Sequence, residues 1–170
     1  LTEEERKNNH KLVAMIYEKE FIKGKNQYLN TFIYHLEKAN EIDKIKKYCL
    51  SISEKMIGKH KNEEAIKYLE KCTRIIEENA IEQKDINIFV ELAELYKMSG
   101  YTVKALETFD IAMFYSQKIG NNKEQVDINE TIVYLLLFKK GELKEAKKRL
   151  QYMKEISENI NYKEGKLKVI

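Results

Sequence analysis

The sequence predicts an all-α fold of about eight helices that pair as antiparallel hairpins, and three observations support this fold class. Apolar residues recur at three- and four-residue spacing almost throughout, and the alternating runs typical of strands are lacking. Ala65, Ala105 and Ala146, each near the start of an amphipathic segment, are 40 and 41 residues apart, as expected of a helical repeat. Proline is absent and only 6 glycines occur, so no flexible linker divides the chain.

The first expected helix covers about residues 2–22. Thr2 is a capping residue, and the acidic residues 3–5 in the first turn suit the positive end of the helix dipole. A turn at Gly24 follows, and the second helix covers about residues 27–39. The apolar residues of this hairpin are Leu12, Val13, Ile16, Tyr17, Phe21, Leu29, Phe32, Ile33 and Leu36.

The third helix is expected at about residues 42–57, and a turn over residues 58–62, with His60, separates it from the fourth. Asp85 is expected to cap the fifth helix, which ends at Gly100, and the sixth ends before Gly120. The apolar positions of these four helices include Ile45, Cys49, Ile52, Met56, Ile66, Leu69, Cys72, Ile76, Phe89, Leu92, Ala93, Tyr96, Leu106, Phe109, Ala112 and Met113.

The seventh helix, at about residues 124–140, is the most apolar, and the eighth covers about residues 143–159. Residues 132–138 are apolar on too many sides for a helix with one face in solvent. Either the seventh helix is sandwiched between the sixth and eighth helices and the C-terminal tail, or it contributes to a homodimer contact. The tail, residues 161–170, is either a frayed end or the stub of another helix.

Composition excludes several classes of protein. The net charge of +3 is small and lysine is mixed with glutamate, which argues against direct nucleic-acid binding by this segment. The longest apolar run has seven residues, fewer than a membrane helix needs. Cys49 and Cys72 are too few for a disulfide framework and lie on apolar helix faces, so we expect reduced core residues and a cytoplasmic protein. The chain begins with Leu1 rather than Met, which suggests a piece of a longer protein.

The third hairpin carries a motif, Phe89-x2-Leu92-Ala93-x2-Tyr96-x3-Gly100-x4-Ala105-x3-Phe109-x2-Ala112. This motif resembles the tetratricopeptide repeat (TPR), in which an aromatic residue, Leu, a small residue and Tyr precede Ala-x3-Phe on the next helix. The resemblance implies a right-handed superhelix of hairpins, a TPR-like α-solenoid, as a single domain over residues 1–170. Residues 42–159 would hold the clear repeats and residues 1–40 a degenerate first hairpin.

The same resemblance implies a concave groove, lined by the first helix of each hairpin, that binds a peptide or protein segment. The groove positions that it implies are Leu50, Glu54, Ile57, Asn87, Val90, Glu94, Lys97, Thr131, Leu135 and Phe138, with Glu18 and Ile128 at related positions. Glu18, Glu54 and Glu94 would form a line of carboxylates, which suits a peptide with a basic or amino-terminal group and repels acidic chaperone tails. Glutamate is also common on any exposed helix face, so plain solvation is the alternative.

We expect a binding module rather than an enzyme. His10, His35 and His60 lie far apart without metal-ligand spacing, and no glycine-rich phosphate loop occurs, so no catalytic residue, metal or cofactor is predicted. Residues 92–106 are similar to the C-terminal sensor domain of peptide-responsive regulators of Gram-positive bacteria (the Rap, NprR and PlcR group). That resemblance implies quorum sensing and transcription regulation through a captured signalling peptide. The alternatives are a TPR scaffold for protein assembly and a regulatory region fused to an enzyme.

Overall fold

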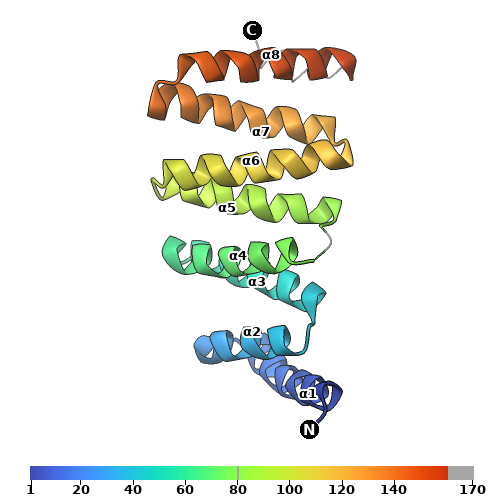
Figure 1. Ribbon diagram of the computed structural model, residues 1–170. Coiled ribbons are helices and arrows are strands. Elements are labelled where there is room, and N and C mark those ends of the chain that lie inside the picture. The colour runs from blue at the N-terminus through green and yellow to red at the C-terminus, as the bar shows by residue number, and fades with distance from the viewer. Residues whose placement is uncertain (80, 161–170) are drawn as a thin grey trace. The chain divides into compact units, whose positions relative to one another are not determined.

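The computed structural model of the protein describes residues 1–79 and 81–160, and these residues form eight α-helices (Figure 1). The all-α prediction is confirmed, because none of the described residues lies in a strand. The chain divides into two compact units, Leu1–Glu78 and Asn79–Ile170. The predicted tail at residues 161–170 lies outside the described residues.

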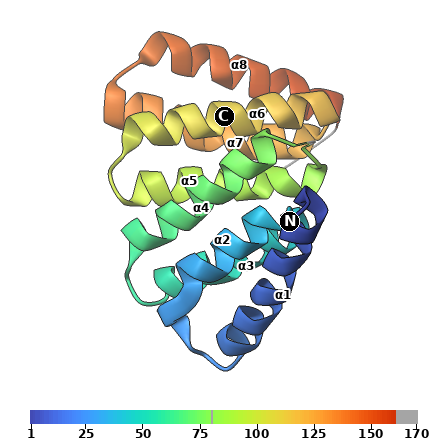
Figure 2. The same ribbon diagram turned by 60° about the horizontal axis from the view of Figure 1, so that its bottom comes forward.

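The unit of residues 1–78 consists of two antiparallel hairpins (Figure 2). Its helices are α1 (Glu3–Ile22), α2 (Leu29–Lys38), α3 (Ile42–Ile57) and α4 (Asn62–Glu77), with a short 3₁₀ helix, η1 (Asn26–Tyr28), before α2. Helices α1 and α2 pack together, as do α3 and α4, and α2 also contacts α3. The core of the unit therefore lies between successive helices.

Aromatic side chains join three helices of this unit. The Tyr48 ring of α3 meets Phe21 of α1 and Phe32 of α2 edge to face, with ring centroids 5.4 Å and 4.9 Å apart. All three rings are buried. Such edge-to-face pairs add specific attraction to the burial of apolar surface. The first hairpin is therefore held to the second by aromatic packing.

Helix α1 begins as predicted but does not bury the predicted face. Thr2 and Glu5 form a capping box, in which the backbone N–H of Thr2 donates to Glu5 Oε2 (2.7 Å) and the backbone N–H of Glu5 donates to Thr2 Oγ1 (3.2 Å). Leu12 and Ile16, expected among the apolar packing residues, are exposed instead. Apolar residues occur on both sides of α1, and the side with Ala14 and Phe21 is the buried one.

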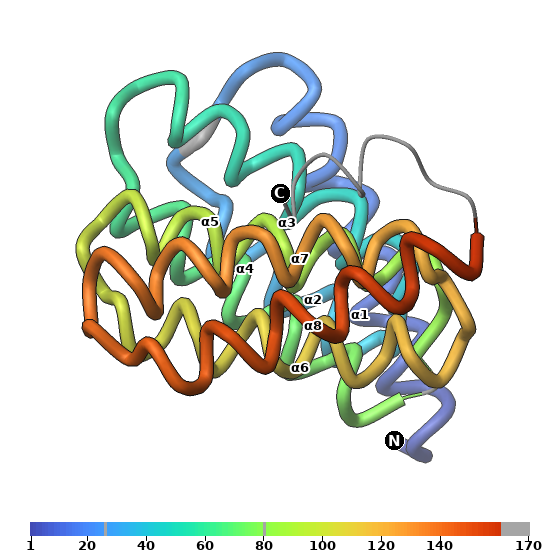
Figure 3. Tube along the Cα trace, turned by 90° about the horizontal axis from the view of Figure 1, so that it is seen from above, coloured from blue at the N-terminus to red at the C-terminus, as the bar shows by residue number. Residues whose placement is uncertain are grey.

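The unit of residues 79–170 also consists of hairpins, and Figure 3 shows α7 and α8 running in opposite directions. Its helices are α5 (Ile86–Met98), α6 (Thr102–Ile119), α7 (Asn122–Leu135) and α8 (Leu143–Asn159), with a 3₁₀ helix, η2 (Gln83–Asp85), before α5 and a π-helical segment, η3 (Leu136–Lys140), after α7. Helix α7 contacts both α6 and α8. Ile132, Val133 and Leu136 are buried, so two flanking helices cover much of the apolar run.

The small residues that indicated a repeat occupy closely packed positions. Ala65, Ala105 and Ala146 are all 0 % exposed. Each lies in the first turns of the second helix of a hairpin, in α4, α6 and α8. A larger side chain at these places would overpack the hairpin.

The turn of the second hairpin has histidine in the left-handed conformation that glycine adopts in other turns. Gly100 has φ of 84° and Gly141 has φ of 68°, the left-handed conformation that commonly ends a helix. His60 adopts φ of 57° in the α3–α4 turn. A non-glycine residue in this region carries some backbone strain.

Helix α5 begins after Asp85, as predicted, but the Asp85 side chain does not cap the helix in the usual way. Asp85 holds the N-cap position without a capping hydrogen bond from its side chain to α5. Its buried carboxylate instead accepts a hydrogen bond from the backbone N–H of Glu82 at 3.0 Å, which closes η2. Among the described helices, none is long and apolar enough to span a bilayer.

Candidate functional site

A pocket of about 430 Å³ lies between α5 and α7, within the unit of residues 79–170. It is lined by Val90, Glu94, Phe109, Asn121, Lys123, Glu124, Asp127, Ile128 and Thr131. Three of these residues (Val90, Glu94 and Thr131) are among the ten groove positions that the sequence predicts, and Ile128 was placed beside them. We define this cavity as the α5–α7 pocket.

The α5 wall of the pocket carries Glu94 at its centre. Its carboxylate is half-buried, forms an ion pair with Lys97 one turn later, and accepts a long hydrogen bond (3.5 Å) from Thr131 Oγ1 of α7. The Thr131 contact joins the two walls. Lys97, also a predicted groove residue, thus takes part as the counterion of Glu94.

The α7 wall begins at a helix cap that fixes a second carboxylate. The backbone N–H of Glu124 donates to Asn121 Oδ1 at 3.4 Å, and Asn121 Nδ2 donates to Glu124 Oε2 at 2.7 Å. This reciprocal arrangement holds Glu124 in the first turn of α7, where the helix dipole favours a negative charge. Glu124 therefore has a defined place on the rim of the pocket.

Burial and crowding of like charges act on the Glu124 carboxyl. Burial raises its pKa, the negative charge of Asp127 raises it further, and the hydrogen bond from Asn121 works in the opposite direction. The net shift is upward, which means that the charged form of Glu124 is less stable here than in water. A cation placed beside Glu124 would stabilise the charged form.

The pocket combines negative charge with an apolar floor. Glu94, Glu124 and Asp127 supply three carboxylates against Lys123 in the lining, and Lys97 adjoins Glu94. Val90 supplies apolar surface at the pocket, and the buried side chains of Ile128 and Phe109 lie beneath it. This arrangement suits a cationic group carried on an apolar stem.

The other predicted groove positions do not line the pocket. Asn87 is exposed on α5, one turn before Val90. Leu135 is 1 % exposed and belongs to the core of its unit, because α7 is packed between α6 and α8. Phe138, in η3, is 72 % exposed, and its ring lies tilted against that of Tyr134 with ring centroids 5.1 Å apart.

The remaining predicted positions belong to the unit of residues 1–78. Leu50 of α3 is half-buried, whereas Glu54 is exposed and Ile57 is partly exposed near the end of the same helix. Glu18 of α1 is bound by its own neighbours, since it accepts hydrogen bonds from Lys44 Nζ (2.8 Å) and from Tyr48 Oη of α3. Glu18 therefore ties two helices together.

Glu18, Lys44 and Tyr48 form a hydrogen-bonded cluster, the Glu18 cluster, which shifts the pKa values of Glu18 and Tyr48. Although burial opposes the shift, the hydrogen bonds from Lys44 and Tyr48 hold the pKa of Glu18 below its ordinary value. Burial, followed by the hydrogen bond to Glu18 and its charge, raises the pKa of Tyr48 to about 12. Both shifts favour the charged carboxylate and the neutral phenol, which is the hydrogen-bonded form.

Sequence reasoning did not assign five of the lining residues to the site, namely Phe109, which was expected in the core, and Asn121, Lys123, Glu124 and Asp127. A signal for two of them was present, because residues 124, 127, 128 and 131 recur at helical spacing and share one face of α7. Asn121 required knowledge of the cap, and its role follows only from its hydrogen bonds with Glu124.

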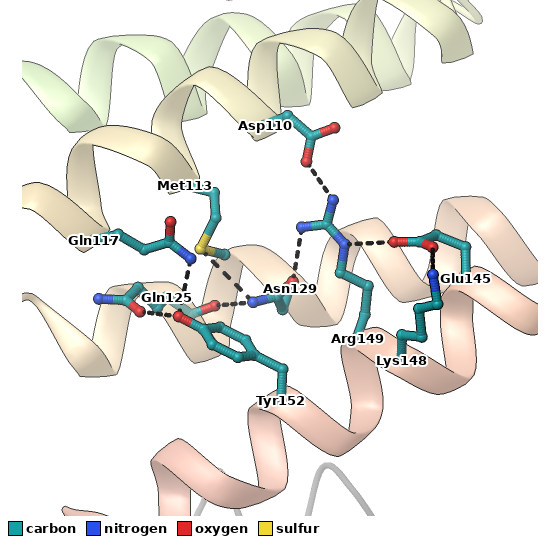
Figure 4. A network of polar contacts seen from close by, with 9 residues as sticks. All are labelled: Asp110, Met113, Gln117, Gln125, Asn129, Glu145, Lys148, Arg149 and Tyr152. Carbon is teal, nitrogen blue, oxygen red and sulfur yellow. Dashed lines mark hydrogen bonds and ion pairs between the residues drawn. The ribbon is translucent and has the colours of Figure 1, made fainter.

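A polar network fixes the other side of α7 to α6 and α8 (Figure 4). Arg149 of α8 donates to Asp110 Oδ1 of α6 at 2.7 Å and to Asn129 Oδ1 of α7 at 3.3 Å. Its Nε atom lies 3.5 Å from Glu145 Oε1. One guanidinium thus joins three helices.

Buried amides complete this network. Gln125 Nε2 donates to the backbone carbonyl of Ser116 at 3.2 Å, and the Tyr152 hydroxyl donates to Gln125 Oε1 at 2.6 Å. Asn129 Nδ2 donates to the backbone carbonyl of Gln125 at 3.0 Å and lies 3.7 Å from Met113 Sδ. Satisfied buried networks fix one packing arrangement, so α7 presents its pocket side in a set orientation.

The described residues contain no group of three or more His, Cys, Asp or Glu side chains that could hold a metal ion. Comparisons of the chain with protein-family models, with curated proteins and with solved structures give no match.

Proposed function

We propose that the chain is a non-catalytic binding module of the TPR type, in which the hairpins form a right-handed solenoid and the α5–α7 pocket binds a peptide. The α5–α7 pocket is the observation that carries this proposal. It gathers Val90, Glu94 and Thr131, which the repeat pattern assigns to the ligand-binding face. The buried Ala65, Ala105 and Ala146 support the repeat assignment.

The lining favours a lysine or arginine side chain of the peptide as the group that enters the pocket. The aliphatic stem of such a side chain would pack on the apolar floor at Val90, above Ile128 and Phe109, as long basic side chains do on apolar surface. Its cationic head would lie near Glu94 and Glu124 and form charge-assisted hydrogen bonds with them, which are stronger than hydrogen bonds between neutral groups. An acidic side chain would be repelled by the same carboxylates.

The biological setting that we propose follows from the resemblance of residues 92–106 to peptide-responsive regulators. In this proposal the module is cytoplasmic, senses a short signalling peptide and acts through another part of a bacterial regulator. It contacts neither nucleic acid nor membrane itself. A helix-turn-helix in the same polypeptide would support the regulator, whereas a secretion domain would point to a scaffold and a catalytic domain to enzyme regulation.

The test is isothermal titration of the chain with a pool of short synthetic peptides that each contain one lysine or arginine. The best binder is then compared with a copy in which methionine replaces the basic residue. We expect the copy to bind about tenfold more weakly, the usual effect of losing a charged hydrogen-bonding partner.

Variants locate the site. Glu94→Gln and Glu124→Gln should each weaken the basic peptide about tenfold while leaving the methionine copy unchanged. Glu107→Gln is the matched control, because Glu107 is an exposed carboxylate of α6 outside the pocket. Equal affinity of the two peptides, or a loss as large in Glu107→Gln as in the pocket variants, would refute the proposal.

A further inference from the structure

Cys49 and Cys72 face each other in the seam between α3 and α4. These helices are in contact, and each has one buried face whose positions recur at steps of three and four residues. Because α3 ends at Ile57 and α4 begins at Asn62, residues at similar distances from the turn face each other. The buried pairs, whose residue numbers add to 121, are Met56–Ala65, Ile52–Leu69, Cys49–Cys72 and Ile45–Ile76.

The two thiols meet within this layer of the seam. The Cys49 side chain is hydrogen-bonded to that of Cys72, and both residues are 0 % exposed. The axes of packed helices lie about 8–10 Å apart and each Cα atom lies about 2.3 Å from its axis, so facing Cα atoms come within the roughly 4–7 Å that a disulfide spans. Both thiols are free in this structure. The layer therefore holds two reduced sulfurs within bridging range.

We propose that Cys49 and Cys72 are a site of reversible oxidation, at which hydrogen peroxide converts the two thiols into a disulfide between α3 and α4. The sulfur of one cysteine attacks a peroxide oxygen, the O–O bond breaks, and a sulfenic acid and one water are formed. The second sulfur then attacks the first and loses its proton, the S–O bond breaks, and a second water leaves. The two sulfurs together supply the two electrons that reduce the peroxide.

Opening of the α3–α4 hairpin controls the first step. The hydrogen bond with Cys72, together with burial, raises the pKa of the Cys49 thiol, and the thiolate is the form that attacks an oxidant. The closed hairpin should therefore react slowly, and local opening should expose the thiols. When the hairpin closes again, the oxidised sulfur returns to its partner across the seam. The expected product is consequently a bridge within one chain.

The bridge should hold the two helices together. It closes a loop over residues 49–72, and restricting that loop in the unfolded chain should lower the equilibrium constant for unfolding of residues 1–78 on the order of a hundredfold. Phe89 and Ala112 occupy the corresponding places forty residues later, so the α5–α6 hairpin cannot form such a bridge. The inference concerns a site in residues 1–78 and does not depend on peptide binding at the α5–α7 pocket.

Counting free thiols tests the site. The full chain is treated with excess hydrogen peroxide, unfolded in urea and given N-ethylmaleimide, and the bound maleimides are counted by mass spectrometry. Because the chain has two cysteines, the untreated chain should bind two maleimides. The oxidised chain should bind none, and dithiothreitol should restore both sites. Mass mapping of peptides should place the link between Cys49 and Cys72 of one chain.

Cys49→Ala and Cys72→Ala are the matched controls, because each leaves one thiol that has no partner for an internal bridge. A thiol that these variants lose to excess peroxide should pass on to the sulfinic acid, which dithiothreitol does not restore. Amide hydrogen exchange of the unaltered chain measures the consequence without any variant. The amides of α3 and α4 should exchange more slowly in the oxidised chain than in the same chain after dithiothreitol.

Three results would overturn the proposal. The first is two maleimides bound by the unaltered chain after peroxide treatment. The second is loss of its thiols that dithiothreitol restores no better than in Cys49→Ala and Cys72→Ala. The third is a disulfide that links separate chains and not α3 to α4 of one chain.

Discussion

Glu18 and Glu94 hold the same place in the predicted repeat, one in each unit, yet their surroundings differ. Lys44 and Tyr48 of α3 hydrogen-bond to the Glu18 carboxylate, which ties α1 to α3. The Glu94 carboxylate has its own helix's Lys97 and a long contact with Thr131, and it borders a cavity. The helices packed against each carboxylate therefore determine its role. Glu18 is bound by residues of α3, whereas Glu94 borders a cavity.

Removing the floor of the α5–α7 pocket should destabilise the chain more than a change at either carboxylate. Phe109→Ala deletes a fully buried ring and should cost about 3–5 kcal/mol of unfolding free energy, because the space left behind is not refilled. Urea unfolding followed by circular dichroism measures the loss. Phe114→Ala, at a half-exposed ring of the same helix, should cost under about 1 kcal/mol. Similar losses for the two variants would show that Phe109 is not a core residue.

Replacing Glu18 should cost more unfolding free energy than replacing Glu94, although both losses are smaller than that of Phe109→Ala. Glu18→Gln should lower the free energy of unfolding by about 1 kcal/mol near neutral pH, and Glu94→Gln should lower it less. Because the pKa of Glu18 in the folded chain lies below its ordinary value of 4.5, its stabilisation is present above 4.5 and is lost as pH falls through the folded pKa.

The measurement is thermal unfolding of the wild type and Glu18→Gln at a series of pH values. The difference in melting temperature between them should shrink steadily in acid. A difference in melting temperature that stays constant across the series would mean that the charge of Glu18 does not contribute to stability.

A weak dependence of stability on pH is expected from a pair of histidines in the first hairpin. His10 Nδ1 and His35 Nδ1 lie 2.8 Å apart between α1 and α2, a contact that needs one of the two nitrogens without a proton. Burial, and then the charge of His10, lower the pKa of His35 below its ordinary value of 6.5. Stability is therefore lost as pH falls from 6.5 towards the folded pKa, because the unfolded chain binds the proton first.

Replacing His35 should remove this loss, which we expect to be under about 1 kcal/mol. The decrease in melting temperature between neutral and mildly acidic pH should be smaller in His35→Phe than in the wild type. His60→Asn is the control, since His60 is exposed in a left-handed turn that asparagine tolerates. An unchanged decrease in His35→Phe would show that the histidine pair does not titrate with folding.

Helix positions and small packing residues were predictable because they depend on local periodicity. Ala65, Ala105 and Ala146 are buried and Thr2 caps α1, as the sequence indicated. The buried face of α1 was not predictable in the same way. Its apolar residues occupy both sides, so only the partner helices determine that Phe21 is inside and Leu12 outside.

The candidate site was predictable in part for the same reason. The α5 side, Val90 and Glu94, follows from the repeat motif, which is clearest in that hairpin. The α7 side depends on where that helix begins and how it is rotated, and these are fixed by the Asn121 cap and by Gln125 and Asn129 within the polar network. No short-range pattern encodes that rotation, and Leu135, assigned to the groove by analogy, is buried as a result.

The two cysteines have a practical consequence. Hydrogen bonding with Cys72, together with burial, raises the pKa of the Cys49 thiol, and both residues are 0 % exposed in α3 and α4. The chain has no other cysteine, so a thiol reagent can react only when the α3–α4 hairpin opens. The rate of that reaction therefore reports local opening of residues 1–78. The unit of residues 79–170 has no cysteine and adds no signal.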